Sequence, residues 1–151
     1  MARIRSIDDR DYYLGGIKLD HVDFEKDQGV LFSHNLSWND HADLISLKAQ
    51  RMLNVLYRTC RDINDISTKK LLYITWVRLR LEYASVVWSP HTKRIIDNLE
   101  QVQGRATRFV LGRDYSGYER LSKLNLLLLK YRREINDFRF SFLSVLRIYI
   151  S

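Results

Sequence analysis

The first 36 residues carry short runs in which apolar and polar residues alternate, as expected for strands. In the stretch YYLGGIKL, Gly15 and Gly16 lie between two such runs. Two glycines supply the positive φ angles that a two-residue hairpin turn requires, so a β-hairpin is predicted over residues 12–19. The stretch GVLFS, residues 29–33, predicts a second strand segment.

After Ser37 the apolar spacing changes to that of a helix, predicted up to about Cys60. Ser37 stands three residues before Asp40, which is close to the capping-box spacing that begins many helices. A second helix is predicted from Ser67 or Thr68 to Ser89, because the residue before a proline avoids the helical region. The apolar stripe of the first helix consists of Ile45, Ala49, Met52, Leu53 and Leu56.

The second helix is ambiguous, because residues 77–83 also alternate strictly between apolar and charged, as in a half-buried strand. A longer helical spacing favours the helix, in which Arg78 and Glu82 are four apart and are predicted to pair on the outer side. Arg80 falls nearer the apolar side and must extend outward or meet a carboxylate. The predicted inner stripe is Leu72, Trp76, Leu79, Tyr83 and Val86.

Three more helical segments complete the predicted fold. One covers residues 92–111 and ends at Gly112, because glycine is a good C-terminal cap. A short helix covers residues 119–125, and a last helix starts near Leu127. The fold class is therefore mostly α, with a small N-terminal β segment followed by a bundle of four to five helices. The stripe of the 92–111 helix is Ile95, Leu99, Val102, Ala106 and Phe109, and one face of the last helix holds Tyr131, Ile135, Phe138, Phe142, Val145 and Tyr149.

Composition fits one soluble domain, since the chain has 151 residues, 46% of them hydrophobic, and a single cysteine. Residues 71–88 are long enough to span a membrane, but Arg78, Arg80 and Glu82 near their middle are costly in lipid. No membrane association is expected, and no small-molecule substrate is indicated. We expect an intracellular protein, in the nucleus, the cytoplasm or both.

The charge is uneven along the chain. The net charge of the whole chain is +7. Residues 1–60 contain 8 Lys/Arg and 9 Asp/Glu, a net of −1, whereas residues 61–151 contain 17 Lys/Arg and 9 Asp/Glu, a net of +8. Such asymmetry indicates a basic surface for a polyanion, or else an ordinary solvated face.

The helix over residues 92–111 carries the clearest basic face. Arg94, Gln101, Arg105 and Arg108 follow at intervals of seven, four and three, so they share one side of it. This is the pattern of a helix that contacts phosphates, and also that of an ordinary amphipathic helix with solvated arginines. The other candidate nucleic-acid contacts are Lys48, Arg51, Arg58, Arg113, Lys130, Arg132 and Arg133.

Enzyme motifs are absent from the sequence. It has no Walker phosphate loop and no GxSxG nucleophile motif, and its four histidines include no i, i+4 pair that would hold a metal on a helix. Asp8 and Asp9 are the only adjacent carboxylates, but they lack the apolar strand flanks that would fix them around Mg²⁺. No catalytic residue and no metal site are therefore predicted.

Several longer motifs nevertheless resemble one family. Residues 12–16, 26–30, 36–41 and 48–51 read YYLGG, KDQGV, LSWNDH and KAQR. They are similar to the Y-x-L-G-G, K-D-L-G-V, L-S-W-x-x-H and K-A-x-R motifs of LINE-type (non-LTR) retrotransposon reverse transcriptases, most of all the jockey and chicken-repeat elements. Further on, VRLRLEYASVVWSP, LEQVQGRATRF and RLSKLNLLLLKYRREINDF resemble motifs of the same enzymes in the same order, so the resemblance covers about residues 12–142.

The resemblance implies the end of the palm over residues 1–36, a thumb-like bundle over residues 37–112, and post-thumb helices over residues 113–151. The family's Mg²⁺-binding palm aspartates lie upstream of these motifs, and Asp8 and Asp9 do not match them. This chain alone is therefore expected to bind no cofactor and to be inactive as an RNA-directed DNA polymerase. Its expected partners are the template–primer duplex, held by its phosphates, and the remainder of a reverse transcriptase.

Some positions depart from the family pattern. Gln28 stands in place of leucine, Leu79 and Leu128 in place of prolines, and Gly104 in place of an arginine. These departures indicate a decayed or truncated copy of an element, or an incomplete gene model. Two alternatives to a duplex-gripping thumb remain: a helical module that binds protein, and the non-functional relic of a decayed element.

Overall fold

Two antiparallel hairpins precede the helices. The structure, a computed structural model, describes residues 11–90 and 92–150, with the side chains of residues 148–150 outside the described part. β1 (Tyr13–Leu14) pairs with β2 (Ile17–Lys18), and β3 (Phe24–Asp27) pairs with β4 (Val30–Ser33). Gly15 and Gly16 have φ angles of 58° and 83°, so the predicted hairpin turn is confirmed. β4 confirms the predicted second strand segment, whereas the sequence pattern did not predict β3.

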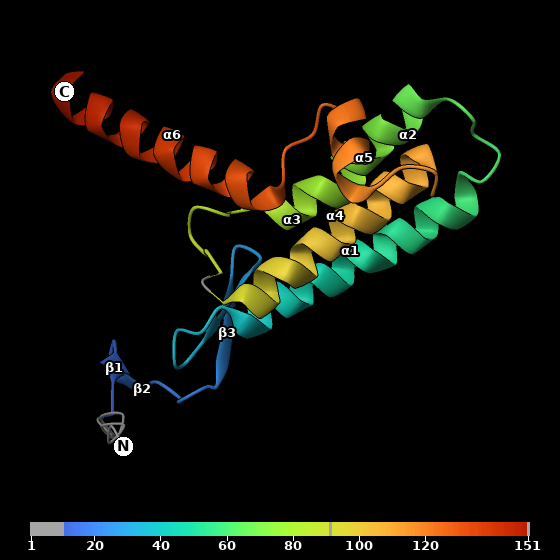
Figure 1. The fold of residues 1–151 in the computed structure, drawn as a ribbon. Coiled ribbons are helices and arrows are strands. Elements are labelled where there is room, and N and C mark those ends of the chain that lie inside the picture. The colour runs from blue at the N-terminus through green and yellow to red at the C-terminus, as the bar shows by residue number, and fades with distance from the viewer. Residues whose placement is uncertain (1–10, 91, 151) are drawn as a thin grey trace, which may run out of the picture.

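α1 (Asn39–Thr59) and α4 (Lys93–Leu111) lie side by side and run in the same direction (Figure 1). Arg94 hydrogen-bonds to Asp43 and Arg105 to Asn54, and both pairs are separated by 51 residues. A constant separation along two helices requires a parallel arrangement. The predicted bounds of both helices and their buried stripes are confirmed, except that Met52 is only partly buried.

The predicted capping box at the start of α1 is wrong. Trp38 is the N-cap residue and provides no side-chain cap, and the Ser37 hydroxyl only accepts a 3.3 Å hydrogen bond from the backbone N–H of Asn39. The Ser37 carbonyl is bonded at 2.9 Å to the hydroxyl of Ser33, which ties the start of the helix to β4.

Residues 66–82 form a helical segment that packs against α1 and α4 but differs from its prediction. It consists of α2 (Ile66–Leu72), the π-helical stretch η1 (Tyr73–Arg78) and α3 (Leu79–Glu82). Asp65, rather than Ser67 or Thr68, is the N-cap, accepting a 2.7 Å hydrogen bond from the Thr68 N–H.

The end predicted at Ser89 is also wrong, because the helix stops at Glu82. Tyr83 has an extended ψ of 129° and Ala84 a positive φ of 51°, so the chain turns sharply there. The Trp88 indole N–H then donates to the Tyr83 carbonyl at 2.8 Å. The turn places the fully buried Trp88 in the core, which a helix continuing to Ser89 would not do.

Of the predicted stripe only Leu72 packs against the core, partly buried, and the other members do not form the buried face of this segment. Trp76 is 51% exposed, and Leu79, Tyr83 and Val86 are exposed as well. The fully buried residues are Tyr73, Val77 and Leu81, which are four apart. A π-helix has more residues per turn than an α-helix, so a spacing of four stays on one face there.

Arg78 and Glu82 do pair as predicted, at 3.0 Å, but on the inner side, where their side chains are only 8% and 10% exposed. Arg132 forms a second ion pair with the same carboxylate. Arg80 is exposed, in keeping with the outward orientation required of it, and its Nε donates to the Trp76 carbonyl at 3.0 Å.

The remaining helices are α5 (Gly117–Lys123) and α6 (Leu129–Ile150). α5 begins with a complete capping box between Ser116 and Glu119. Leu124, Leu126 and Leu129 belong to the same core as the buried residues of α1 and α4, so α6 starts within the bundle. From there α6 extends away from the other helices (Figure 1).

His41 joins the β3–β4 hairpin to the helices. Its imidazole is fully buried, and Nδ1 accepts a 2.9 Å hydrogen bond from the backbone N–H of Leu31. Its ring lies edge-on to Trp88, with a centroid distance of 4.9 Å. Burial, together with the nearby charge of Lys48, lowers the pKa of His41 below its usual value.

We expect the chain to lose stability as the pH falls from about 6.5, the ordinary histidine pKa, through the lower pKa of folded His41. The reason is that the unfolded chain then binds a proton more readily than the folded one. Urea denaturation between neutral and mildly acidic pH measures the change. His41→Gln should remove this component of the pH dependence; a variant with an unchanged profile would contradict the role of His41.

Candidate nucleic-acid interface

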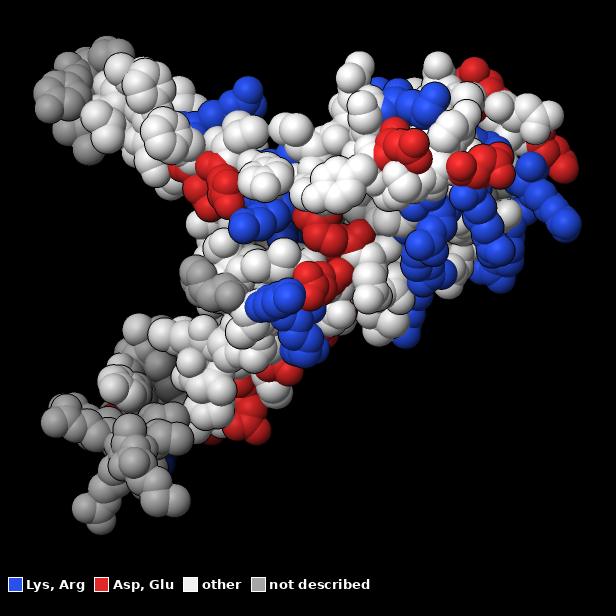
Figure 2. Space-filling model, in the orientation of Figure 1, with Lys and Arg blue, Asp and Glu red and all other residues white. Residues whose placement is uncertain are grey.

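Four arginines surround one hollow at the end of the bundle where α1 and α4 finish. Arg58 comes from the last turn of α1, Arg105 and Arg108 from α4, and Arg113 from the loop that follows. The hollow has a volume of about 830 Å³. Figure 2 shows lysine and arginine side chains gathered over this end of the molecule. All four residues are among the predicted nucleic-acid contacts, and the fold brings them together.

The parallel packing of α1 and α4 explains why the arginines converge. Two helices that run in the same direction end on the same side, so their last turns meet. Gly112 ends α4 with a φ of 83°, and the chain then turns so that Arg113 lines the hollow together with residues at the end of α1. The C-terminal ends of helices carry partial negative charge, which stabilises these cations in the free protein.

Neighbouring polar groups hold one of the arginines in place. Asn54 accepts a 3.1 Å hydrogen bond from the Arg105 guanidinium, and the Tyr57 hydroxyl donates to the Arg105 carbonyl, also at 3.1 Å. The Tyr57 ring packs edge-on against Phe109, with centroids 5.1 Å apart. A fixed arginine loses less conformational freedom on binding, which favours an interface.

Sequence reasoning missed Asn54, Tyr57 and Gly112, which complete the lining of the hollow. Asn54 precedes Arg58 by four residues on α1, and this helical spacing is the signal that could have found it. Among the described residues, no aspartate or glutamate lines the hollow. Four guanidinium groups around a hollow whose described lining contains no carboxylate suit the phosphate groups of a nucleic acid, to which arginine forms charge-assisted hydrogen bonds.

The other predicted contacts lie elsewhere. Lys48 lines a separate hollow of about 270 Å³ with Arg80 and Tyr83, and Arg94 pairs with Asp43 at 3.2 Å near the opposite end of α4. Arg51, Gln101 and Lys130 are exposed, but none of them lines the arginine hollow.

Arg132 and Arg133 are not available for phosphate contacts in this geometry. Arg132 is engaged by the buried carboxylate of Glu82, with a second hydrogen bond of 3.0 Å. Arg133 is 4% exposed and donates to the Leu81 carbonyl at 2.9 Å, and its guanidinium lies 4.7 Å from the ring centroid of Trp88. We therefore leave both out of the candidate interface: Arg133 is buried, and Arg132, whose side chain is 34% exposed, is paired with Glu82.

The described residues contain no group of three or more His, Cys, Asp or Glu side chains that could hold a metal ion. Asp8 and Asp9 lie outside the described residues. No helix in the described ranges is both long and apolar enough to cross a membrane. Comparisons with protein-family models, curated proteins and solved structures gave no match to this chain.

Proposed function

We propose that this chain is a nucleic-acid-binding part of a LINE-type reverse transcriptase, acting as a thumb that grips the template–primer duplex. The motif resemblance suggests the family, and the hollow formed by Arg58, Arg105, Arg108 and Arg113 carries the proposal for this chain. Such an activity belongs inside the cell, in the nucleus or the cytoplasm.

The proposed mechanism is positional rather than chemical. Guanidinium groups from two helices and a loop contact successive phosphates and fix the orientation of the duplex without reading its bases. Among these contacts, the guanidinium of Arg105 is oriented by its 3.1 Å hydrogen bond to Asn54. Because the family's catalytic aspartates are not in this sequence, the chain on its own is expected to bind duplex without extending a primer.

The test is duplex binding at several salt concentrations, measured by fluorescence anisotropy with a labelled RNA–DNA template–primer. Arg105→Ala combined with Arg108→Ala should weaken binding to all sequences alike. The slope of log affinity against log salt should decrease by about two, because each lost phosphate contact removes about one released counterion.

A matched control removes the same charge from exposed residues outside the hollow. Lys26→Ala combined with Arg80→Ala also reduces the net charge from +7 to +5 (7 − 2), and should leave most of the salt slope intact. Equal losses in the two variants would mean that binding depends on net charge and not on this hollow. Binding without salt dependence would favour the alternative of a protein-interaction module, and a chain without a cooperative melting transition would favour a relic.

A further inference from the structure

The outer part of α6 is a helix without a partner. Residues 138–147 are all exposed, and the apolar ones are not scattered singly: Phe138 is 80% exposed, Phe140 58% and Phe142 60%. Figure 1 shows this part of α6 projecting from the bundle. A helix with so much apolar surface normally buries one face against another element.

Its apolar residues follow the spacing of a coiled coil. The positions that continue along one face are separated by four and three residues in turn, a mean of 3.5, which is the heptad spacing that keeps two helices in contact. In the heptad notation abcdefg, Ile135 and Phe142 occupy a, and Phe138 and Val145 occupy d. Tyr131 and Tyr149 extend the pattern to nearly three heptads in the sequence. We call these six positions the seam.

The surface of α6 also has the shape that such packing requires. Phe138, Ser141, Phe142 and Val145 line a hollow of about 220 Å³. These four residues are spaced i, i+3, i+4 and i+7, the set that forms a hole for a side chain of a facing helix in knobs-into-holes packing. The hollow therefore lies on the seam and is open to a second helix.

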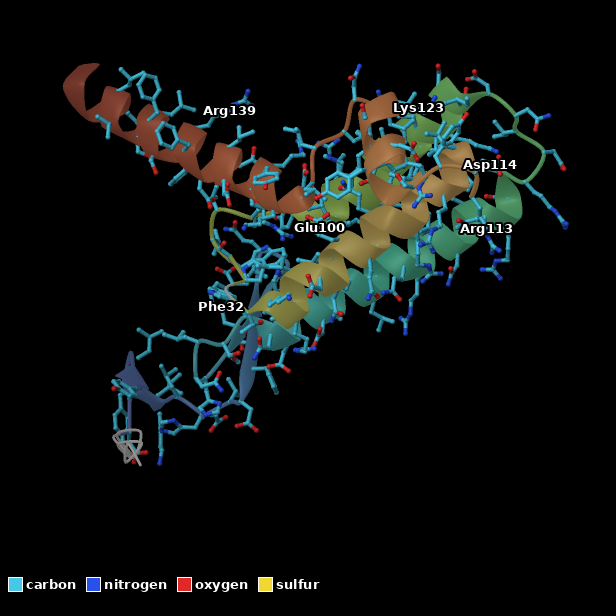
Figure 3. The ribbon with its side chains drawn as sticks, viewed as in Figure 1. Phe32, Glu100, Arg113, Asp114, Lys123 and Arg139 are labelled. Atoms are coloured by element: carbon cyan, nitrogen blue, oxygen red, sulfur yellow. The ribbon has the colours of Figure 1, made fainter. Side chains whose placement is uncertain are left out.

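The charges beside the seam indicate which helix fits. Glu134 occupies position g and Arg139 position e of the next heptad. In a parallel pair of identical helices, g of one chain lies beside this e of the other, so Glu134 and Arg139 would form two interchain ion pairs. An antiparallel pair would instead place e positions opposite one another, with arginine facing arginine. Figure 3 shows Arg139 extending from α6 beyond the bundle.

We propose that α6 forms a parallel two-stranded coiled coil with α6 of a second copy of this chain. The dimer joins two bundles at their α6 helices, and each bundle keeps its own arginine hollow. The proposal rests on the seam, its hollow and the flanking charges, and does not depend on the proposed function.

Sedimentation equilibrium of the full chain over a range of concentrations tests it. We expect a mass of twice 18.1 kDa that dissociates on dilution. Phe138→Asp combined with Phe142→Asp should raise the dissociation constant at least about tenfold, because buried apolar anchors dominate helix association. Both side chains are exposed in the single chain, so circular dichroism should show an unchanged bundle.

Two controls distinguish association through the seam from non-specific hydrophobic association. Phe140→Asp changes a phenylalanine of similar exposure that lies off the seam, and should leave the dimer intact. Arg139→Glu should weaken the dimer, and adding Glu134→Arg should restore it by exchanging the paired charges. A chain that remains monomeric, an equal loss with Phe140→Asp, or no rescue by the double charge exchange would each overturn the parallel coiled coil.

Discussion

Replacing Glu82 with alanine is expected to lower the free energy of unfolding by about 3–5 kcal/mol, because it leaves buried positive charge without a partner. The carboxylate holds Arg78 at 3.0 Å in the interior and accepts two hydrogen bonds from Arg132. Burial alone would raise the pKa of Glu82, but hydrogen bonds from Arg132 and Arg78 outweigh it and hold the pKa below its usual value. The stabilisation is thus present above the ordinary glutamate pKa and is lost as the pH falls through the lower pKa of the folded state.

Urea denaturation followed by circular dichroism measures this change. Asp43→Ala is the matched control, since it removes the carboxylate of an exposed ion pair with Arg94 and should cost at most about 1 kcal/mol. Glu82→Gln keeps the shape and one acceptor oxygen, and should fall between the two. Similar losses for Glu82→Ala and Asp43→Ala would show that the inner ion pairs do not stabilise the fold.

Trp88→Ala should be equally damaging, with a loss of about 3–5 kcal/mol, because it empties a fully buried site for a large ring. The substitution also leaves the Tyr83 carbonyl without the indole N–H that closes the turn after α3. It further removes the ring on which the guanidinium of Arg133 lies, and the edge contact with His41.

The chain provides a control of the same residue type in the same region. Trp76 is 51% exposed, so Trp76→Ala should cost less than about 1 kcal/mol in the same denaturation experiment. Trp88→Phe retains a buried ring without the hydrogen bond and should be intermediate. A Trp76 variant as unstable as Trp88→Ala would contradict the burial that distinguishes the two tryptophans.

Elements whose local signals agree with their tertiary setting were predictable from the sequence. α4 has five apolar residues on one regular stripe and a glycine that stops it, and both features were confirmed. The hairpin between β1 and β2 followed from two adjacent glycines in the same way. In these segments the local preference and the packing require the same structure.

The prediction for residues 66–90 was wrong for an identifiable reason. The π-helical stretch η1 changes which residues face the core, so a stripe counted with α-helical spacing selected exposed residues such as Trp76 and Leu79. The helix end was missed because it depends on Trp88 bonding back to Tyr83, a contact set by burial of the indole. Neither cause has a signal in local spacing.

The candidate interface was predictable only in part, because charge alone does not tell an outer arginine from an inner one. Arg105 and Arg108 follow from helical spacing, whereas their approach to Arg58 depends on the parallel packing of α1 and α4. From the sequence alone, Arg132 resembles any other surface cation. Its partner Glu82 is 50 residues away in the sequence, so only the structure shows that the two residues form an ion pair.

The π-helical stretch η1 also determines which parts of the protein the segment from α2 to α3 contacts. The wider turn changes the angular phase of the helix, so that Glu82, which follows the stretch, contacts a different neighbour from Tyr73 and Val77 within it. Tyr73 and Val77 join the apolar core and the Tyr73 hydroxyl reaches Gln103 of α4, whereas Glu82, one turn beyond, meets Arg132 of α6. Residues 66–82 therefore contact both the apolar core and α6, and the ion pair between Glu82 and Arg132 holds the first turn of α6 against the bundle.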